Sequence, residues 1–239
     1  MKHIIPLLLI VGLPVVVLSA VGPVAAQSLL PDREASCDPA AASSIPLNDA
    51  SSEAAACARR TYQLPAADTV ELSQHHYDRV EVVAWDEPDI EVETVVVARR
   101  TTMDGARSDL PLIKLQQIDG MLTSAGPDDD APGWWSVKYR LRVPAQTTLA
   151  ITSDNGDIAV RDVAGGHELQ SKNGDIRYRL PAGAGARLQA ETNHGAIDVG
   201  FPITVQGRLS NQLDTVVGGG GPTVRLVTEN GDITIRRAE

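Results

Sequence analysis

The sequence predicts an all-β protein built as a repetitive β-solenoid, or β-helix-like fold. The tetrapeptide Asn-Gly-Asp-Ile occurs three times in the second half of the chain, and hydrophobic residues alternate with polar ones between the copies. A fixed period of about 20 residues indicates one supersecondary unit stacked on itself. Alternation over several residues indicates half-buried strands. Together the two patterns predict repeats of about 18–20 residues, each containing two strands.

Five asparagines set this period, and the spacings between them are 18, 20, 18 and 19 residues. Three of them open the identical tetrapeptide. We interpret Asn193 as the start of a copy expanded by one residue, and Asn211 as the start of a degenerate copy. The predicted corner residues of the repeats are Asn155, Gly156, Asn173, Gly174, Asn193, Gly195, Asn211, Asn230 and Gly231.

The residue types at these corners suit a tight connection between strands. Glycine adopts positive φ freely, and asparagine tolerates it better than most residues do. The asparagine side chain can also bond nearby backbone groups and hold a corner. We therefore expect the corner glycines to be selected for positive φ.

The N-terminus has the pattern of a cleaved signal peptide over residues 1–26. Lys2 precedes an apolar run over residues 4–17, and small residues follow it before Gln27. The run is too short to cross ~30 Å of hydrocarbon as one helix, and Pro14 interrupts it. We therefore expect a secreted or periplasmic protein of the cell envelope, with no stable membrane anchor after cleavage.

Residues 27–67 are rich in Ala, Ser and Pro and show no strand alternation. They predict an irregular spacer with one short helix over residues 52–60, because Ala and Arg favour helices. Cys37 and Cys57 are expected to form a disulfide, as a cysteine pair in an exported chain most simply does. It would close a loop of about 20 residues and stabilise the fold by roughly 3 kcal/mol. The solenoid domain is predicted to occupy residues 68–239.

The formal net charge is −10. Binding to nucleic acid needs a basic surface, so this function class is disfavoured. An acidic, hydrated surface that keeps the protein in solution is the simplest explanation of the charge.

The recurring Asn-Gly-Asp-Ile corners, the strand over residues 137–144 and the segment 80–86 resemble the DUF4097 family of exported bacterial proteins. Members of this family are also described as adhesins, or as head domains of autotransporter adhesins. The resemblance covers about residues 68–239. It implies a β-solenoid-like domain and an envelope or surface location.

Three corner aspartates, Asp157, Asp175 and Asp232, would come to one edge of the solenoid. A column of carboxylates could bind Ca²⁺, which takes six to eight oxygen ligands. The nonapeptide of calcium-loaded β-rolls is absent, however, so a turn-stabilising role is the favoured interpretation. No metal site and no cofactor are therefore predicted, and Ca²⁺ remains the weak alternative.

No catalytic residue is predicted, because the chain has no Gly-x-Ser-x-Gly elbow, no phosphate loop and no zinc-type histidine spacing. Trp134 and Trp135 leave open an aromatic platform for a sugar ring. The leading prediction is a non-catalytic, adhesin-like binding or scaffolding module of the cell envelope, with a surface protein or glycan as partner. A carbohydrate-active β-helical enzyme and a calcium-stabilised structural element are the alternatives.

Overall fold

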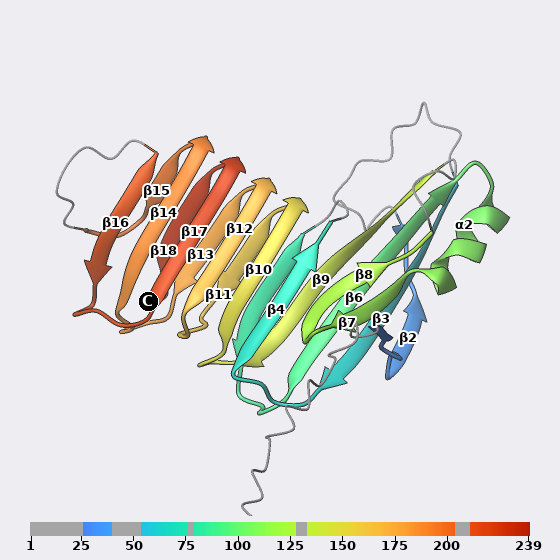
Figure 1. Ribbon diagram of the computed structural model, residues 1–239, viewed down its shortest axis with the longest axis horizontal. Coiled ribbons are helices and arrows are strands. Elements are labelled where there is room, and N and C mark those ends of the chain that lie inside the picture. The colour runs from blue at the N-terminus through green and yellow to red at the C-terminus, as the bar shows by residue number, and fades with distance from the viewer. Residues whose placement is uncertain (1–25, 40–53, 76–78, 128–132, 204–210) are drawn as a thin grey trace, which may run out of the picture.

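The protein folds into two β-sheets that lie face to face as two layers of one elongated stack (Figure 1). The computed structural model describes residues 26–39, 54–75, 79–127, 133–203 and 211–239. The predicted all-β, solenoid-like fold class is confirmed, because strands run in parallel rungs through most of the second half of the chain.

The first sheet, sheet A, contains nine strands. In spatial order they are β1 (Gln27–Ser28), β7 (Lys114–Ile118), β8 (Met121–Ala125), β4 (Thr69–Gln74), β10 (Thr148–Asn155), β12 (His167–Asn173), β17 (Thr223–Asn230), β14 (Ala186–His194) and β16 (Gln212–Val217).

The second sheet, sheet B, also contains nine strands. In spatial order they are β15 (Ile197–Val199), β18 (Ile233–Arg237), β13 (Ile176–Leu180), β11 (Ile158–Arg161), β5 (Val80–Trp85), β9 (Trp134–Pro144), β6 (Ile90–Arg100), β3 (Ala54–Leu64) and β2 (Arg33–Ser36).

Each repeat contributes one strand to each sheet. The chain leaves sheet A at an Asn-Gly-Asp corner and enters sheet B at the isoleucine that follows. This happens from β10 to β11, from β12 to β13 and from β17 to β18. Equivalent residues pair in register, so Asn155 lies opposite Asn173 and Ile158 lies opposite Ile176. The repeat in the sequence is thus a repeat in space.

The core fills the space between the two sheets. Its residues come from alternate positions of the strands and are mostly medium-sized aliphatics. Fully buried examples from the repeats are Leu149, Ile151, Leu169, Leu188 and Leu226 in sheet A, and Ile158, Val160, Ile176, Ile233 and Ile235 in sheet B. Burial of a Leu or Ile side chain contributes about 1.5–3 kcal/mol.

The spatial order of the repeats differs from their order in the sequence. Strand β17 pairs with β12 on one side and with β14 on the other. Strand β18 likewise lies between β13 and β15. The last repeat of the chain, residues 223–237, is therefore inserted between two earlier ones. Figure 1 shows it as the red strands within the orange ones.

The prediction that residues 27–67 form an irregular spacer is wrong for the part the structure describes. Strand β3 pairs with β6 over eleven residues, and β2 pairs with β3. The predicted helix over residues 52–60 is also wrong from residue 54 onward. Ala58, Arg60 and Tyr62 are buried, whereas Arg59 and Gln63 are exposed, so the alternation exists. The alternation does not show as a pattern of large hydrophobic residues, because alanine and arginine take inward positions.

The Cys37–Cys57 disulfide is present, with the two Cα atoms 5.4 Å apart. Cys57 packs with Val95 and Val97 of β6 in a small cluster separate from the main core. The bridge therefore connects residue 37, just past the edge strand β2, to the middle of β3.

One short helix, α2 (Met103–Asp109), and a 3-10 turn, η1 (Leu110–Leu112), follow β6. The guanidinium of Arg60 donates to the carbonyl oxygens of Leu110 (2.8 Å) and Ile113, and its Nε bonds Glu34 at 2.8 Å. Arg100 forms an ion pair with Asp109. Two largely buried arginines thus anchor this segment to the sheets.

No helix within the described ranges has the length and apolar character that crossing a membrane requires. The predicted signal peptide falls almost wholly on residues 1–25, which lie outside the described residues, and it stays a prediction.

Candidate functional site

The Asn-Gly-Asp corners form a hydrogen-bonded column along one edge of the stack. Asn173 Nδ2 donates to Asn155 Oδ1 at 3.0 Å, and Asn230 Nδ2 donates to Asn173 Oδ1 at the same distance. The same two amides also donate to the backbone carbonyl oxygens of Asp154 and Lys172. All four acceptors lie on the neighbouring rung, so each of these asparagine amides bonds that rung through both a side chain and the backbone.

The aspartates form a second column beside the first. The carboxylate of Asp157 accepts from the backbone amide of Asp175 at 3.0 Å, Asp175 accepts from that of Asp232 at 2.9 Å, and Asp232 accepts from that of Ala196 at 2.8 Å. Each carboxylate thus bonds a backbone donor of the neighbouring rung. The three aspartates that are the weak calcium candidates therefore each use a carboxylate oxygen to accept one of these hydrogen bonds. The described residues contain no group of three or more His, Cys, Asp or Glu side chains that could hold a metal ion. Calcium binding stays a prediction.

The corner glycines allow the rungs to approach closely. A Cβ placed on Gly174 would lie 2.3 Å from the carbonyl oxygen of Gly156, and one on Gly195 would lie 2.0 Å from that of Gly231. The φ angles of Gly174 and Gly195 lie outside the left-handed region, so the expectation of positive φ is wrong at these two corners, whereas Gly231 has a positive φ of 156°. Close backbone contact is the reason that glycine stands here.

The structure changes the interpretation of the other two asparagines. His194, rather than Asn193, lies opposite Asn230, and Ile197 lies opposite Ile233. The corner is therefore His194-Gly195-Ala196-Ile197, which has the ordinary length and two substituted positions. Asn211 precedes β16, which runs antiparallel to β14 at the edge of sheet A and is not a rung of the repeat.

A groove with basic walls lies on the outer face of sheet B. Its volume is about 310 Å³, and five arginines and one glutamate line it, together with Ala159 and Thr234. These charged residues are Arg79, Glu81, Arg161, Arg177, Arg179 and Arg236. Pairing across β5, β11, β13 and β18 brings them together from segments far apart in the sequence. A concentration of five arginines is unexpected on a protein of net charge −10.

Four of the five arginines have acidic partners. Arg177 bridges Asp157 and Asp175, each at 2.7 Å, and Arg179 forms a bidentate pair with Asp162. The other two pair at the ends of the groove, Arg79 with Glu81 and Asp157, and Arg236 with Asp198. These pairs hold the guanidinium groups in fixed positions around the groove.

Arg161 differs from the others. It is exposed, and it has no acidic partner within the described part of the chain. Its neighbours across the sheet are Val83 on β5 and Arg179 on β13, neither of which can neutralise it. Asp162, the next residue along the chain, is already paired with Arg179. The groove therefore carries one guanidinium available to a ligand.

Glu81 and Asp157, two carboxylates at this face, have pKa values below their ordinary values. Burial disfavours the charged form of Glu81, but the nearby charges of Lys138, Arg140 and Arg79 outweigh burial and hold its pKa below the ordinary value. Burial likewise opposes ionisation of Asp157, and hydrogen bonds from Arg177 and from the Asp175 amide outweigh it, so this pKa is also lowered.

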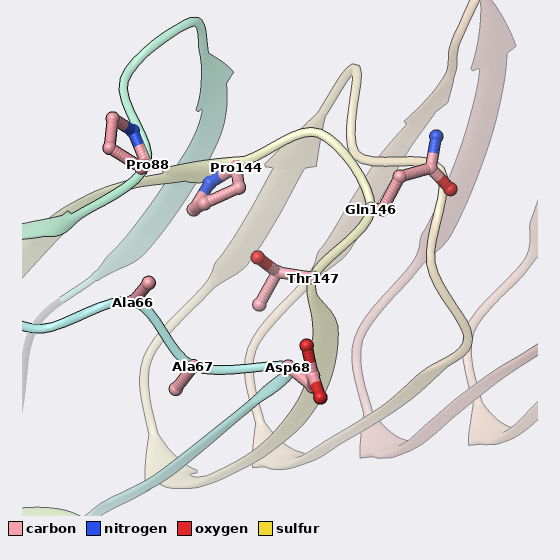
Figure 2. A pocket seen from close by; sticks show the side chains of 7 residues that line it. All are labelled: Ala66, Ala67, Asp68, Pro88, Pro144, Gln146 and Thr147. Atoms are coloured by element: carbon pink, nitrogen blue, oxygen red, sulfur yellow. The ribbon is translucent and has the colours of Figure 1, made fainter.

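A second concavity of about 480 Å³ lies where the β3–β4, β5–β6 and β9–β10 connections meet. Figure 2 shows Pro88 and Pro144 on one side, Ala66 and Ala67 on the other, and Asp68, Gln146 and Thr147 at one end. Most of its lining is small and apolar. It presents one carboxylate, one amide and one hydroxyl group, which is a sparser set of polar groups than that of the basic groove.

A chain of three side chains, which the sequence did not suggest, joins β4 to β10. His75 Nε2 lies 3.1 Å from Ser73 Oγ, and His75 Nδ1 lies 2.8 Å from Asp154 Oδ2. The order of these contacts is that of a hydrolase triad. Ser73, however, is only 6% exposed, and its oxygen already accepts from Thr152 at 3.2 Å. The nucleophile position is covered, and the arrangement is that of a surface hydrogen-bond network.

Neither tryptophan presents an exposed ring face of the kind that the aromatic platform requires. Trp135 is buried, and its ring nitrogen donates to the Pro127 carbonyl at 3.1 Å. The ring of Trp134 lies under the guanidinium of Arg99, 4.4 Å from its centroid.

Two sheets of stacked strands with repeating corners define a protein of the β-solenoid-like class. The chain belongs to the Toastrack DUF4097 family, whose sequence profile matches residues 68–236. The predicted resemblance is confirmed.

Two solved structures illustrate the likeness. A provisionally named cell adhesion protein from Clostridium sporogenes superposes with a TM-score of 0.51 at 12% identity, over 75% of this chain and 99% of its own. A provisionally named adhesin from Bacteroides fragilis gives a TM-score of 0.27 at 11% identity, over 75% and 97%. The first likeness shows the fold, and the second is too weak to carry an argument. Comparison with curated proteins finds no match.

Proposed function

We propose that the protein is a non-catalytic binding module of the bacterial cell envelope, and that the outer face of sheet B is its recognition surface. The basic groove is the observation that carries this proposal. Five arginines, four of them fixed by ion pairs, meet on neighbouring strands over one concavity of a protein that is otherwise acidic. Rigid, pre-positioned polar groups in a concave site are typical of binding sites.

Two further observations support the envelope location. A disulfide persists in oxidising compartments outside the cytoplasm. The Clostridium sporogenes protein of the same fold carries the name of a cell adhesion protein. The family and the fold alone leave the ligand open.

A pull-down from the envelope fraction of the source organism tests the proposal. The full chain is immobilised, and bound proteins and glycans are analysed for the wild type and for two double variants. Arg161→Gln with Arg236→Gln alters sheet B, whereas Arg187→Gln with Arg225→Gln alters exposed arginines of sheet A. We expect the first pair to lose the captured material and the second pair to keep it.

Equal capture by all three proteins would exclude sheet B as the recognition surface. Absence of any captured material from the wild type would contradict a binding module. Incubation of the wild type with the same fraction should generate no new reducing ends, because the proposed module does not cleave what it binds.

A further inference from the structure

We infer that the groove on sheet B binds the carboxylate of an acidic sugar unit in a polysaccharide, with Arg161 as the anchoring residue. This inference rests on the proposed function and names the class of ligand for the same surface. Three features of the groove support it: the unpaired guanidinium of Arg161, the short side chains of the floor, and the carboxylate of Glu81 in the same groove.

The free charge is that of one guanidinium. Arg177, Arg179, Arg79 and Arg236 are each paired with a carboxylate of the protein, so their charges are largely neutralised. A ligand that bound at their expense would have to break these pairs. Within the part of the chain that the structure describes, Arg161 is the one groove arginine that offers donors at no such cost, and its fork of N–H groups matches a carboxylate. The groove is therefore complementary to one negative charge per ligand unit.

The floor of the groove is made by short side chains. Ala159 lies between Glu81 on one neighbouring strand and Arg177 on the other, and Thr234 lies on the far side of Arg177. Neighbouring strands are about 4.8 Å apart, so long side chains beside alanine leave a slot whose walls are the arginine stems. Its volume of about 310 Å³ is at the small end of the range for ligand pockets, which suits a single ring and its substituents.

The carboxylate of Glu81 favours a sugar carboxylate over a phosphate dianion as the ligand of the groove. Its side chain is 15% exposed, lines the groove and is ionised, because Lys138, Arg140 and Arg79 lower its pKa despite burial. An ionised glutamate repels a dianionic phosphate and can only accept hydrogen bonds. The hydroxyl groups of a sugar are donors that Glu81 can accept, and the Thr234 hydroxyl can donate or accept beside them. A ligand with one carboxylate and several hydroxyls fits all three groups.

Calorimetric titration of the full chain with trigalacturonate tests the inference. The matched probes are the trimethyl ester of the same trisaccharide, which lacks the charge, and inorganic phosphate, which lacks the sugar ring and its hydroxyls. We expect trigalacturonate to bind at least tenfold more tightly than either probe. Binding should weaken as salt rises, because the contact with Arg161 is electrostatic.

Two variants locate the site. Arg161→Gln should weaken binding at least tenfold, which is the usual scale for loss of a charged hydrogen-bonding partner. Ala159→Leu leaves every charge in place and fills the floor, and it should weaken binding similarly. Arg225→Gln on sheet A, an exposed arginine that lies 3.8 Å from Glu168, is the control and should change the affinity less than twofold.

Unchanged binding in Arg161→Gln would overturn the inference, as would phosphate binding as tight as that of trigalacturonate. Absence of trigalacturonate binding would also overturn it. If envelope capture still depended on sheet B in that case, the proposed function would survive with another ligand. If capture failed as well, both proposals would be wrong.

Discussion

The C-terminal stack and the N-terminal half share the same two sheets but hold their strands in register by different means. In the stack, short side chains and backbone groups of equivalent positions bond directly from rung to rung. In the N-terminal half, long antiparallel strands pair over eleven residues, and buried arginines reach across to a short helical segment. Repetition allows one corner sequence to be used several times, whereas the irregular half needs a separate contact for each segment.

The largest effect should come from Gly174→Ala in the stack. The added methyl group would lie 2.3 Å from the carbonyl oxygen of Gly156 and 2.5 Å from its carbonyl carbon. Both are backbone atoms that cannot rotate away as a flexible side chain can, so the rungs must separate. We expect a loss of about 3 kcal/mol in the free energy of unfolding, at the upper end for overpacking. Denaturant unfolding followed by circular dichroism measures it.

Gly166→Ala is the control for that variant. Its Cβ would make an ordinary contact of 3.4 Å with the Thr223 carbonyl oxygen, and its φ lies outside the left-handed region. A change below about 1 kcal/mol is expected, because no overpacking arises. Similar losses for both glycines would show that close approach of the corners is not what selects Gly174.

Arg60→Met tests the N-terminal half. The guanidinium of Arg60 is the donor to the carbonyl oxygens of Leu110 in η1 and of Ile113 directly after it, and methionine keeps the apolar stem but no donor. We expect a loss of about 2–3 kcal/mol, because each buried acceptor left without a partner costs about 1–3 kcal/mol. Thermal unfolding monitored by calorimetry gives the value.

Arg59→Met, one residue earlier, provides the comparison. Arg59 is exposed and pairs with Glu93 at 3.1 Å on the outer face. Surface ion pairs contribute about 0–1 kcal/mol, so this variant should be nearly neutral. If Arg59→Met were as harmful as Arg60→Met, burial of the guanidinium would not be the cause.

Asn173→Ala should have an intermediate effect. It removes two donated hydrogen bonds and the one accepted from Asn230. Because all are exposed, we expect a total loss of about 1–2 kcal/mol in the free energy of unfolding.

Asn193→Ala should change stability by less than about 0.5 kcal/mol, since the structure places His194 at the corner instead. Equal losses in equilibrium unfolding would restore Asn193 as a corner residue.

The smallest predicted effect is a gain. His194→Asn would place an amide opposite Asn230, where the pattern of the other rungs has Nδ2 donating to the preceding Oδ1. The column would then extend by one rung, and we expect about 0.5–1 kcal/mol of added stability from one hydrogen bond. A lower melting temperature than that of the wild type would contradict the proposed continuity of the column.

The sequence could predict the corners and the fold class because these depend on local, repeated chemistry. Three identical tetrapeptides fall in register, and the residue types restrict what a corner can be. It could not predict that residues 223–237 lie between earlier repeats, since identical corners fit equally well at several levels of the stack. The sequence also predicts the wrong register for the Asn193 segment, because His194 and Ala196 differ from the residues at the other corners.

Strand β3 and the basic groove were missed for different reasons. In β3, alanines and the stem of Arg60 take inward positions, and tertiary pairing with β6 overrides their helix preference. The groove is made from single residues of four strands, so no local window contains it. The only signal within one strand was the alternation of Arg177, Tyr178 and Arg179, with a buried tyrosine between two exposed arginines.

The insertion of the last repeat has a consequence for the order of assembly. A solenoid whose rungs follow the sequence can grow one level at a time as the chain emerges from a ribosome or a translocation channel. Here β14 and β15 have no partner on the side facing the earlier rungs until residues 223–237 have arrived. Residues 223–237 fill the gap between β12 and β14, so completion of the domain must wait until this segment has been made. Partial chains that lack it keep an open slot between the two strands.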